Sequence, residues 1–506
     1  MNPRSPNLAP CIAVLGTGSD VGKSIITTAL CRIFSRRGVR LAPFKAQNMS
    51  NNSGVTPEGL EMGRAQIVQA EAARIPPHVD MNPILLKPTS DIGSQVVLLG
   101  TARGNHTAAD YHAHKEHLFH EAVAALERLR REFELVILEG AGSCAEVNLM
   151  SADIVNLRMA EQAGAPVVLV ADIHRGGVFG QIVGTLACLE PHQRKLIQGF
   201  IVNRFRGDIA LFADGVRWIE QRTGTRVFGV LPWFDHIRIA SEDSVVIENP
   251  RPVAPPVAGG AAAVAVIRFP HISNFTDFEP LQSLQDLRIH FLEQPQDVSG
   301  FRAIILPGSK NTRHDLDWLK GSGWAEILSA YHSGGGHLLG ICGGYQMLGR
   351  WVHDPEGIEG RSGSTEGLHL LPVDTVLQAP KTTTLTRFSW QDAQGSGYEI
   401  HMGQTARHGG EPLFDVLERS GRAASTEDGC VAPGARVMGT YMHGLFDNPS
   451  ITVRWLRAVG VDTPQAPTLG GLAARDREYD LLADHVEAHV DVEAVMELAE
   501  RKRHGA

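Results

Sequence analysis

Long apolar runs, paired cysteines and blocks of one charge are all scarce in this 506-residue chain. No apolar stretch approaches the ~20 residues of a membrane-spanning helix, and we expect neither a signal peptide nor a membrane span. The six cysteines are scattered without paired spacing, which fits a reducing cytoplasm better than a disulfide framework. A net charge of −9 without a long Lys/Arg block argues against binding to nucleic acid or to an anionic membrane.

The length predicts more than one hydrophobic core, because single cores stop growing well below this size. In the first half, short apolar runs alternate with longer helical patterns, which predicts a parallel sheet with helices on both faces. A stretch rich in Pro, Ala and Gly indicates a linker near the middle of the chain. Similar strand patterns then resume, so we expect two α/β domains in series.

A glycine-rich sequence, GTGSDVGKS, runs from Gly16 to Ser24 between an apolar strand pattern and an apolar helical pattern. This context is typical of a phosphate-binding loop, in which backbone N–H groups and the helix N-terminus hold phosphate oxygens. We expect Lys23 to neutralise the phosphates and Ser24 to bind Mg²⁺. The other residues predicted to contact the nucleotide in this loop are Thr17, Gly18 and Gly22.

Five residues separate the outer glycines of this loop, one more than in the usual motif. The longer loop resembles the dethiobiotin-synthetase-like branch of the P-loop NTPases. That resemblance implies that Glu139, which ends the strand pattern 135–138, helps to hold the metal, and that Asn203 contacts adenine. Without the resemblance, either residue could simply cap a helix or form a turn.

A polar stretch from Lys45 to Ser53 follows another strand pattern. A disordered loop is one interpretation of its composition. The other is a row of hydrogen-bonding groups that positions a substrate rich in carboxylates and amides. On this second hypothesis, the substrate-binding residues are Lys45, Gln47 and Asn48.

The second half contains Gly340-Ile341-Cys342-Gly343-Gly344-Tyr345-Gln346 after a short apolar run. A cysteine with glycines two positions before and after it matches a nucleophile elbow, in which a tight strand-to-helix turn exposes the sulfur. About a hundred residues later, an apolar strand pattern ends at His443, a candidate general base for Cys342. These residues resemble the class I glutamine amidotransferases, whose motif Gln346 completes. Gly343 and the turn at Gly308 and Ser309 are candidate oxyanion and glutamine contacts.

Class I glutaminases place a glutamate two residues after the histidine, but this chain has Leu445 there. The residue that would orient the imidazole is therefore missing from its usual position. Glu399 or Asp447 could replace it. A polar cluster around Asn274, Thr276 and Asp277 either touches the substrate or forms a turn.

The motifs taken together, in order along nearly the whole chain, resemble the cobyric acid synthase family of the cobalamin pathway. The resemblance implies ATP- and glutamine-dependent amidation of the b, d, e and g carboxylates of adenosylcobyrinic acid a,c-diamide. It implies ATP and Mg²⁺ as cofactors, the corrinoid and glutamine as substrates, a cytoplasmic location and a possible homo-oligomer. The implied domains are a P-loop NTPase-like synthetase domain over 1–250, a linker over 251–263, a class I glutaminase-like α/β domain over 264–460 and a helical tail over 461–506.

Two alternatives remain at this point. One is a sister amidotransferase, acting on cobyrinic acid or on a cell-wall precursor. The other is a partitioning-type ATPase with an inactive glutaminase domain. A metal site formed by His112, His114, His117 and His120 is less consistent with the sequence than a solvated helix face, since no further ligands accompany them.

Overall fold

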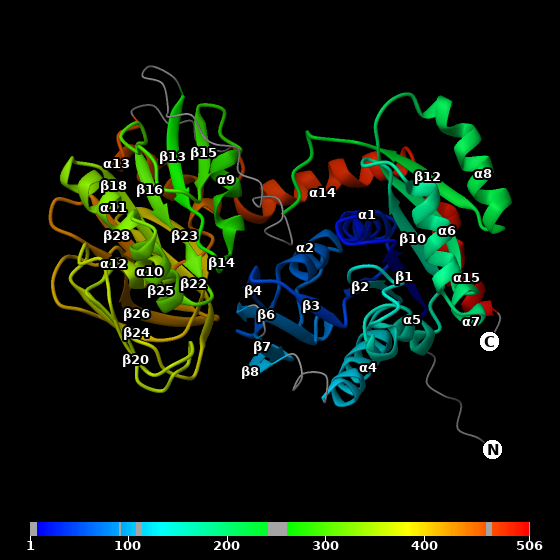
Figure 1. The fold of residues 1–506 in the computed structure, drawn as a ribbon, viewed down its shortest axis with the longest axis horizontal. Helices are drawn as coiled ribbons and strands as arrows, with labels where there is room; N and C mark the ends of the chain where they lie inside the picture. Colours follow the sequence, from blue (N-terminus) through cyan, green and yellow to red (C-terminus); the bar gives the residue numbers. More distant parts are fainter. Residues whose placement is uncertain (1–7, 91–92, 108–113, 241–260, 462–467, 505–506) are drawn as a thin grey trace.

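The computed structural model describes residues 8–90, 93–107, 114–240, 261–461 and 468–504. Two α/β lobes lie side by side, and a long C-terminal helix crosses from one to the other (Figure 1). Both lobes contain a predominantly parallel sheet, as the alternating strand and helix patterns predicted. Most of the predicted linker, 251–260, and His112 lie outside the described residues, while β13 begins at Ala262, inside the predicted linker.

The first lobe is built on six strands in the order β12-β11-β10-β1-β9-β2, all parallel. Their bounds are Val227–Pro232, Ile197–Phe205, Val167–Asp172, Cys11–Gly16, Leu135–Glu139 and Leu41–Phe44. The helices of this lobe are α1 Lys23–Arg36, α2 Arg64–Ala72, α4 Lys115–Glu132, α5 Leu157–Ala163, α6 Val178–Cys188, α7 Pro191–Arg194 and α8 Ala213–Thr223. Apolar residues fill both faces of the sheet, which is why its strands are almost continuously apolar.

A smaller layer of this lobe faces the second lobe. It contains the sheet β3-β6-β7-β8 (Gln47–Met49, Ile84–Ser90, Gly93–Leu98, Thr101–Thr107) and the hairpin β4-β5 (Ser53–Val55, Glu61–Gly63). The polar stretch from Lys45 to Ser53 is therefore ordered and enters this layer, rather than forming a disordered loop.

The second lobe has a central sheet in the order β15-β13-β16-β18-β28-β27, parallel except for β27. The strands span Leu287–Leu292, Ala262–Ile267, Ala303–Leu306, His337–Ile341, Val437–Thr440 and Cys430–Val431. The helices are α9 Glu279–Gln282, α10 Thr312–Gly321, α11 Trp324–Ser333, α12 Gly343–Leu348 and α13 Pro449–Ala458. The strand before His443 ends at Thr440, so the prediction that it runs to the histidine was wrong.

Two antiparallel sheets and a short strand pair complete the second lobe. One sheet is β20-β19-β21-β24 (Gly363–Glu366, Trp351–Asp354, Val373–Val376, Gln404–Arg407). The other is β23-β22-β25-β26 (Ala393–His401, Thr382–Trp390, Phe414–Arg419, Arg422–Asp428). The pair β14-β17 (Ile272–Ser273, Gly308–Ser309) lies beside the turn at Cys342 and Gly343.

The C-terminal helices α14 (Gly471–Glu487) and α15 (Val492–His504) return to the first lobe. Apolar side chains of both helices join the core on one face of its sheet. Arg32 on α1 is fully buried and pairs with Asp476 and Asp480 at 2.5 and 2.8 Å. Arg475 pairs with Glu71 of the first lobe at 2.9 Å and with Asp447 of the second at 3.0 Å. The tail is thus part of the first lobe's core and also a bridge between the lobes.

Tyr479 provides a test of this packing. Its ring is 1 % exposed, and its hydroxyl donates to Glu71 at 2.7 Å. We expect Tyr479→Ala to lower the free energy of unfolding of the first lobe by about 3–5 kcal/mol, because it leaves a ring-sized cavity. Tyr479→Phe removes only the hydrogen bond and should cost about 1 kcal/mol. Hydrogen exchange of the α1 amides measures both effects.

Leu472 on the same helix is 53 % exposed and offers a matched control, because Leu472→Ala removes no buried contact. Equal protection of the α1 amides in Tyr479→Ala and Leu472→Ala would contradict the placement of the tail in the core.

Candidate active site

Cys342 lies at the tight turn between β18 and α12. Its φ of 53° and ψ of −109° are a conformation that L residues rarely adopt. A Cβ at Gly340 would lie 2.7 Å from the backbone of Gly344, and one at Gly344 would lie 2.0 Å from the carbonyl oxygen of Leu306. Glycine is therefore needed at both flanking positions, as a nucleophile elbow requires.

His443 is oriented by a residue that sequence reasoning did not identify. Its Nδ1 lies 2.7 Å from Oδ2 of Asp277, and the other carboxylate oxygen accepts from the Gly444 N–H at 3.0 Å. Asp277 lies after β14, far from the histidine in sequence. Because it is 3 % exposed at its side chain and bonded on both oxygens, it fixes the imidazole firmly.

The two carboxylates suggested for this role are engaged elsewhere, so those suggestions were wrong. Glu399 accepts from Thr386 and Arg419 at 2.8 and 2.9 Å. Asp447 pairs with Arg475. The polar cluster around Asp277 was visible in the sequence, but nothing in its spacing linked it to His443.

The electrostatics favour the charged form of His443 at this centre. Burial disfavours the imidazolium, but the Asp277 carboxylate, with a further contribution from Cys342, outweighs it and raises the pKa of His443 to about 10. His443 therefore carries a proton at neutral pH. A protonated imidazole in this pocket can act as a general acid toward a leaving group.

The turn Pro307–Ser309 approaches Gly343 and His443 closely. A Cβ on Gly343 would lie 2.8 Å from the Ser309 nitrogen, and one on Gly308 would lie 3.3 Å from Cε1 of His443. The structure thus brings Gly308, Ser309 and Gly343 together around Cys342 and His443. Backbone N–H groups at such a point can stabilise an oxyanion.

Gln346 lines the same pocket as Cys342, but its amide is bonded within the protein. It accepts from Thr312 at 2.9 Å and donates to the Tyr441 hydroxyl at 3.1 Å and to the Met402 carbonyl at 3.2 Å. These contacts hold the pocket wall together. We therefore assign Gln346 a positioning part in the pocket, beside the substrate contact predicted from the motif.

The phosphate loop lies between β1 and α1, at the carboxyl ends of the parallel strands. Gly22 has a φ of 100°, and a Cβ there would lie 2.1 Å from the Asn203 amide nitrogen. That amide donates to the Val21 carbonyl at 2.9 Å, so Asn203 supports the loop from below. Lys23 folds back and donates to the carbonyls of Gly18 and Gly142 at 2.9 and 2.8 Å.

The candidate metal residues lie together beside this loop. Oε1 of Glu139 accepts from the Ser24 hydroxyl and from the Lys45 ammonium, both at 2.9 Å. Its Oε2 accepts from the Gln69 amide. Carboxylate and hydroxyl oxygens are ligands that Mg²⁺ prefers, so the donor set fits that ion. Gln69, fully buried on α2, was not predicted from the sequence.

The remaining predicted residues are less closely grouped. Thr17 Oγ1 contacts Gln181 at 3.4 Å. Asn48 is buried and donates to Gln66 on α2 at 3.1 Å, while Gln47 is half-buried in β3. Of the three residues predicted to bind the substrate, Lys45 contacts Glu139 at the nucleotide site. The described interactions include no such contact for Gln47 or Asn48.

The first lobe contributes to the wall of the pocket over Cys342. Lys87 of β6 lines it together with residues of the second lobe. Glu61 of β5 links the lobes, because its two oxygens accept from Lys87 at 2.7 Å and from Lys381 at 2.6 Å. Ser53 adds a second bridge through its N–H, which donates to Asn274 at 3.0 Å.

The segment formed by β5 and α2 contacts both centres. Glu61, at its beginning, pairs with the lysines at the Cys342 pocket, while Gln69, further along, bonds Glu139 at the phosphate loop. Burial would raise the pKa of Glu61, but Lys381 and Lys87 outweigh it and lower that pKa far below its ordinary value. The two reaction centres thus face the same short stretch of buried polar chain.

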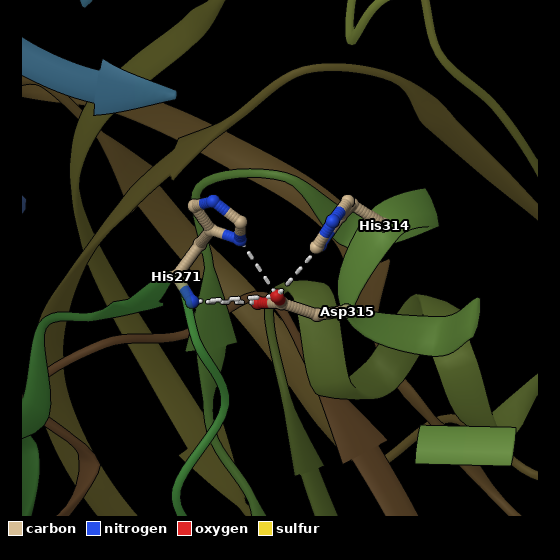
Figure 2. A group of neighbouring side chains, drawn as sticks. All are labelled: His271, His314 and Asp315. Carbon is tan, nitrogen blue, oxygen red and sulfur yellow. Dashed lines mark hydrogen bonds and ion pairs between the residues drawn. The ribbon is translucent and has the colours of Figure 1, made fainter. Parts of the chain in front are cut away.

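One further cluster lies beside this pocket. It consists of three side chains that could bind a metal, His271, His314 and Asp315 (Figure 2). Within the described ranges, this is the group of three or more such side chains that lie close together. Asp315 is fully buried and accepts from His271 Nδ1 at 2.8 Å and from the Ser309 hydroxyl at 2.6 Å. Its contacts anchor the Pro307–Ser309 turn. The histidines of α4 form no such group among the described residues.

Comparison with known proteins agrees with this division of the chain. Residues 12–246 match the CobQ/CobB/MinD/ParA nucleotide binding domain, and residues 263–451 match the CobB/CobQ-like glutamine amidotransferase domain. Fold and sites together define a glutamine amidotransferase with its own P-loop NTPase-like domain, as the sequence predicted.

Curated relatives match almost end to end. The cobyric acid synthase of Chlorobium phaeobacteroides (strain DSM 266) is 49 % identical over 494 residues, covering 97 % of each chain. Those of Chlorobaculum tepidum and Moorella thermoacetica are 48 % and 44 % identical, covering 96 % of this chain in each case and 97 % and 96 % of theirs. This chain belongs to the cobyric acid synthase family. Within the described ranges, none of its helices is long and apolar enough to cross a bilayer.

Proposed function

We propose that this protein amidates the b, d, e and g carboxylates of adenosylcobyrinic acid a,c-diamide, using ATP and glutamine, to give adenosylcobyric acid. Near-complete similarity to cobyric acid synthases supports the substrate. The observation that carries the mechanism is that the Cys342 pocket and the Glu139 site face one buried polar segment. The sister amidotransferases and the inactive ATPase considered from sequence are not favoured by the family membership.

At the glutaminase centre, the Cys342 sulfur attacks the carboxamide carbon of glutamine. The carbonyl electrons move to the oxygen, next to the backbone of Gly343 and Ser309. When the tetrahedral adduct collapses, the C–N bond breaks, and His443 gives its proton to the leaving nitrogen, which departs as ammonia. Water then attacks the thioester carbon and gives one proton to the neutral His443. The C–S bond breaks, which releases glutamate and frees the Cys342 sulfur, and the remaining proton of the new carboxyl group goes to solvent.

At the synthetase centre, a corrinoid carboxylate attacks the γ-phosphorus of ATP and forms an acyl phosphate, with ADP as leaving group. Ammonia then attacks the acyl carbon and phosphate leaves, which gives the amide. Lys23 and the loop N–H groups bind the phosphates, and Lys45 supplies a positive charge near the phosphoryl group that is transferred. Ser24 and Glu139 would hold Mg²⁺, which when bound neutralises developing negative charge.

The contacts between the lobes would keep ammonia from escaping. Free ammonia is mostly protonated near neutral pH and then cannot act as a nucleophile, so local release beside the acceptor is an advantage. Glu61, Lys87 and Lys381 form the buried seam through which the pocket meets the first lobe.

We expect Lys381→Met to uncouple the two reactions. It removes the cation that links the second lobe to Glu61, but leaves Glu61 paired with Lys87. The ratio of glutamine hydrolysed to amide formed should rise severalfold, because ammonia is lost before capture. Glutamate and amide are measured in the same reaction. Lys195→Met, an exposed lysine of the first lobe, is the control, and an unchanged ratio in Lys381→Met would contradict the seam.

The decisive test of the function is mass spectrometry of purified protein with ATP, Mg²⁺, glutamine and adenosylcobyrinic acid a,c-diamide. One stepwise replacement of OH by NH₂ is expected for each of the b, d, e and g carboxylates. Glutamine labelled with ¹⁵N in its amide should transfer that label to the product. Amidation of cobyrinic acid instead would favour a sister enzyme.

We also propose that the protein acts in the cytoplasm, where ATP and glutamine are abundant. All six cysteines are free thiols, which supports a reducing compartment.

A further inference from the structure

The pocket over Cys342 holds charged side chains for which the amide-cleaving chemistry has no use. Its lining includes three lysines, Lys87, Lys310 and Lys381, and one carboxylate, Glu359. Amide cleavage itself needs a nucleophile, a proton donor and an oxyanion site. The additional charges therefore require another explanation.

The three lysines differ in how they are compensated. Lys87 and Lys381 both donate to Glu61, at 2.7 and 2.6 Å, and belong to the seam between the lobes. In the described part of the chain, no acceptor lies within hydrogen-bond range of the Lys310 ammonium. Burial, together with the two neighbouring lysines, lowers the pKa of Lys310, so a ligand that supplies a negative charge would stabilise its charged form.

Glu359 is the complementary group. One of its oxygens accepts from the Arg313 N–H at 3.1 Å, but among the described residues no cation forms an ion pair with it. Burial raises its pKa, against the attraction of Lys310. A ligand that brings a positive charge would therefore stabilise the Glu359 carboxylate as well.

Both side chains are carried by segments with anchored backbone. Lys310 follows Ser309, whose hydroxyl donates to buried Asp315, and its own N–H donates to the His271 carbonyl at 2.9 Å. The N–H of Glu359 donates to Asp354, also fully buried, at 2.9 Å. The backbone of both residues is therefore anchored, which lowers the cost of ordering them when a ligand binds.

Lys310 directly follows the Pro307–Ser309 turn, which is the candidate oxyanion site. Its side chain therefore begins at the wall of the pocket that also carries this turn. Thr312, in the first turn of α10, donates to Gln346 of the nucleophile helix at 2.9 Å. This bond connects the beginning of α10, close to Lys310 in sequence, to the helix that follows Cys342. Lys310 and Glu359 line the same pocket as Cys342, so a short substrate that reaches Cys342 with one end can place its other end between them.

We propose that Lys310 binds the α-carboxylate of L-glutamine and that Glu359 binds its α-ammonium, so that the two residues select this amino acid among carboxamides. The assignment rests on the proposed function, because it presumes glutamine at Cys342. Glutamine is a zwitterion with a short side chain. A carboxamide without those charges would leave the half-buried Lys310 and Glu359 without the opposite charges that glutamine supplies, which is unfavourable.

The test uses two analogues of glutamine, each lacking one charge. Glutaramate lacks the α-ammonium, and γ-aminobutyramide lacks the α-carboxylate. The KM for glutamine and the inhibition constants of both analogues are measured with the full chain, ATP, Mg²⁺ and the corrinoid. Both variants, Lys310→Met and Glu359→Gln, should raise the KM for glutamine by about 10- to 100-fold, the loss expected for one charge-assisted hydrogen bond.

The two variants should differ in their response to the analogues. Lys310→Met should raise the inhibition constant of glutaramate and leave that of γ-aminobutyramide unchanged. Glu359→Gln should raise the inhibition constant of γ-aminobutyramide and leave that of glutaramate unchanged. Glu356→Gln, which removes an exposed carboxylate from the same loop, should change none of the three constants.

Equal losses for all three ligands in a folded variant would overturn the assignment, as would the reversed pattern. A raised KM for the corrinoid alone would show that the charges serve the other substrate, which also overturns it. Should either variant fail to fold, Lys310→Gln and Glu359→Ala must show the same pattern. If the wild type transfers no nitrogen from glutamine, the proposed function itself fails. If it does so without this pattern, only the assignment of Lys310 and Glu359 fails.

Discussion

Replacing Cys342 by serine is expected to lower the rate of glutamine-dependent amidation by about 10⁴-fold or more, because the nucleophile is lost. The synthetase centre lies in the other lobe, so ammonium salts at alkaline pH should still support ATP-dependent amidation. The measurement compares amide formation from glutamine and from ammonium in the same preparation. The split between the nitrogen sources is the informative result, since general damage would lower both.

The chain offers a control for this substitution. Cys188 is exposed on α6, far from the elbow in the sequence, and Cys188→Ser should retain both activities. Glutamine-driven amidation that survives Cys342→Ser would remove the sulfur from the mechanism.

Asp277→Asn is expected to lower the glutaminase kcat by about 10²- to 10⁴-fold, because the amide cannot hold the imidazole in its charged form and correct tautomer. Asp277 contacts His443 Nδ1 and the Gly444 N–H, so it acts through the imidazole. It is a positioning residue, and its loss should affect kcat more than KM. Amidation with ammonium should again persist, which separates this effect from misfolding.

The pH profile provides a second measure of Asp277. A pKa of about 10 for His443 places the alkaline limb of glutaminase activity near that pH, since the protonated imidazole is the acid. Asp277→Asn removes the main cause of the raised pKa, so the limb should move to lower pH. The stabilisation from this pair is full below the unfolded-state pKa of ~6.5 and is lost as pH rises through the folded value.

Asp447→Asn is the matched control for Asp277→Asn. Unlike Asp277, Asp447 follows His443 closely in sequence, but its carboxylate pairs with Arg475. It should leave the alkaline limb in place. A shift of the limb in Asp447→Asn, and none in Asp277→Asn, would reverse our assignment of the residue that orients the imidazole.

Local pattern was sufficient for much of the fold. The strand before Gly16, the helix after Lys23 and the glycines around Cys342 follow from short-range requirements of apolar period, helix start and close approach. These features are encoded within a few neighbouring residues. The two-domain α/β organisation was therefore predictable, and so was the placement of both centres at strand ends.

The residues that were missed or misassigned act across long sequence distances. Asp277 reaches His443 from another strand end, and Glu61 meets Lys381 across the lobes. Gln69 is one polar residue in a buried helix, and nothing in its neighbourhood points to Glu139. Only the packing of distant elements brings such pairs together, so one sequence cannot specify them.

The return of α14 and α15 to the first lobe has a consequence for how the protein is made. These helices follow the second lobe in chain order, yet they complete apolar packing that begins at α1. During translation, the face of the first sheet that carries α1 stays without its C-terminal helices until the second lobe has left the ribosome. Nascent chains are thus exposed to aggregation for most of their synthesis, and a gene fragment cut between the lobes should yield insoluble product.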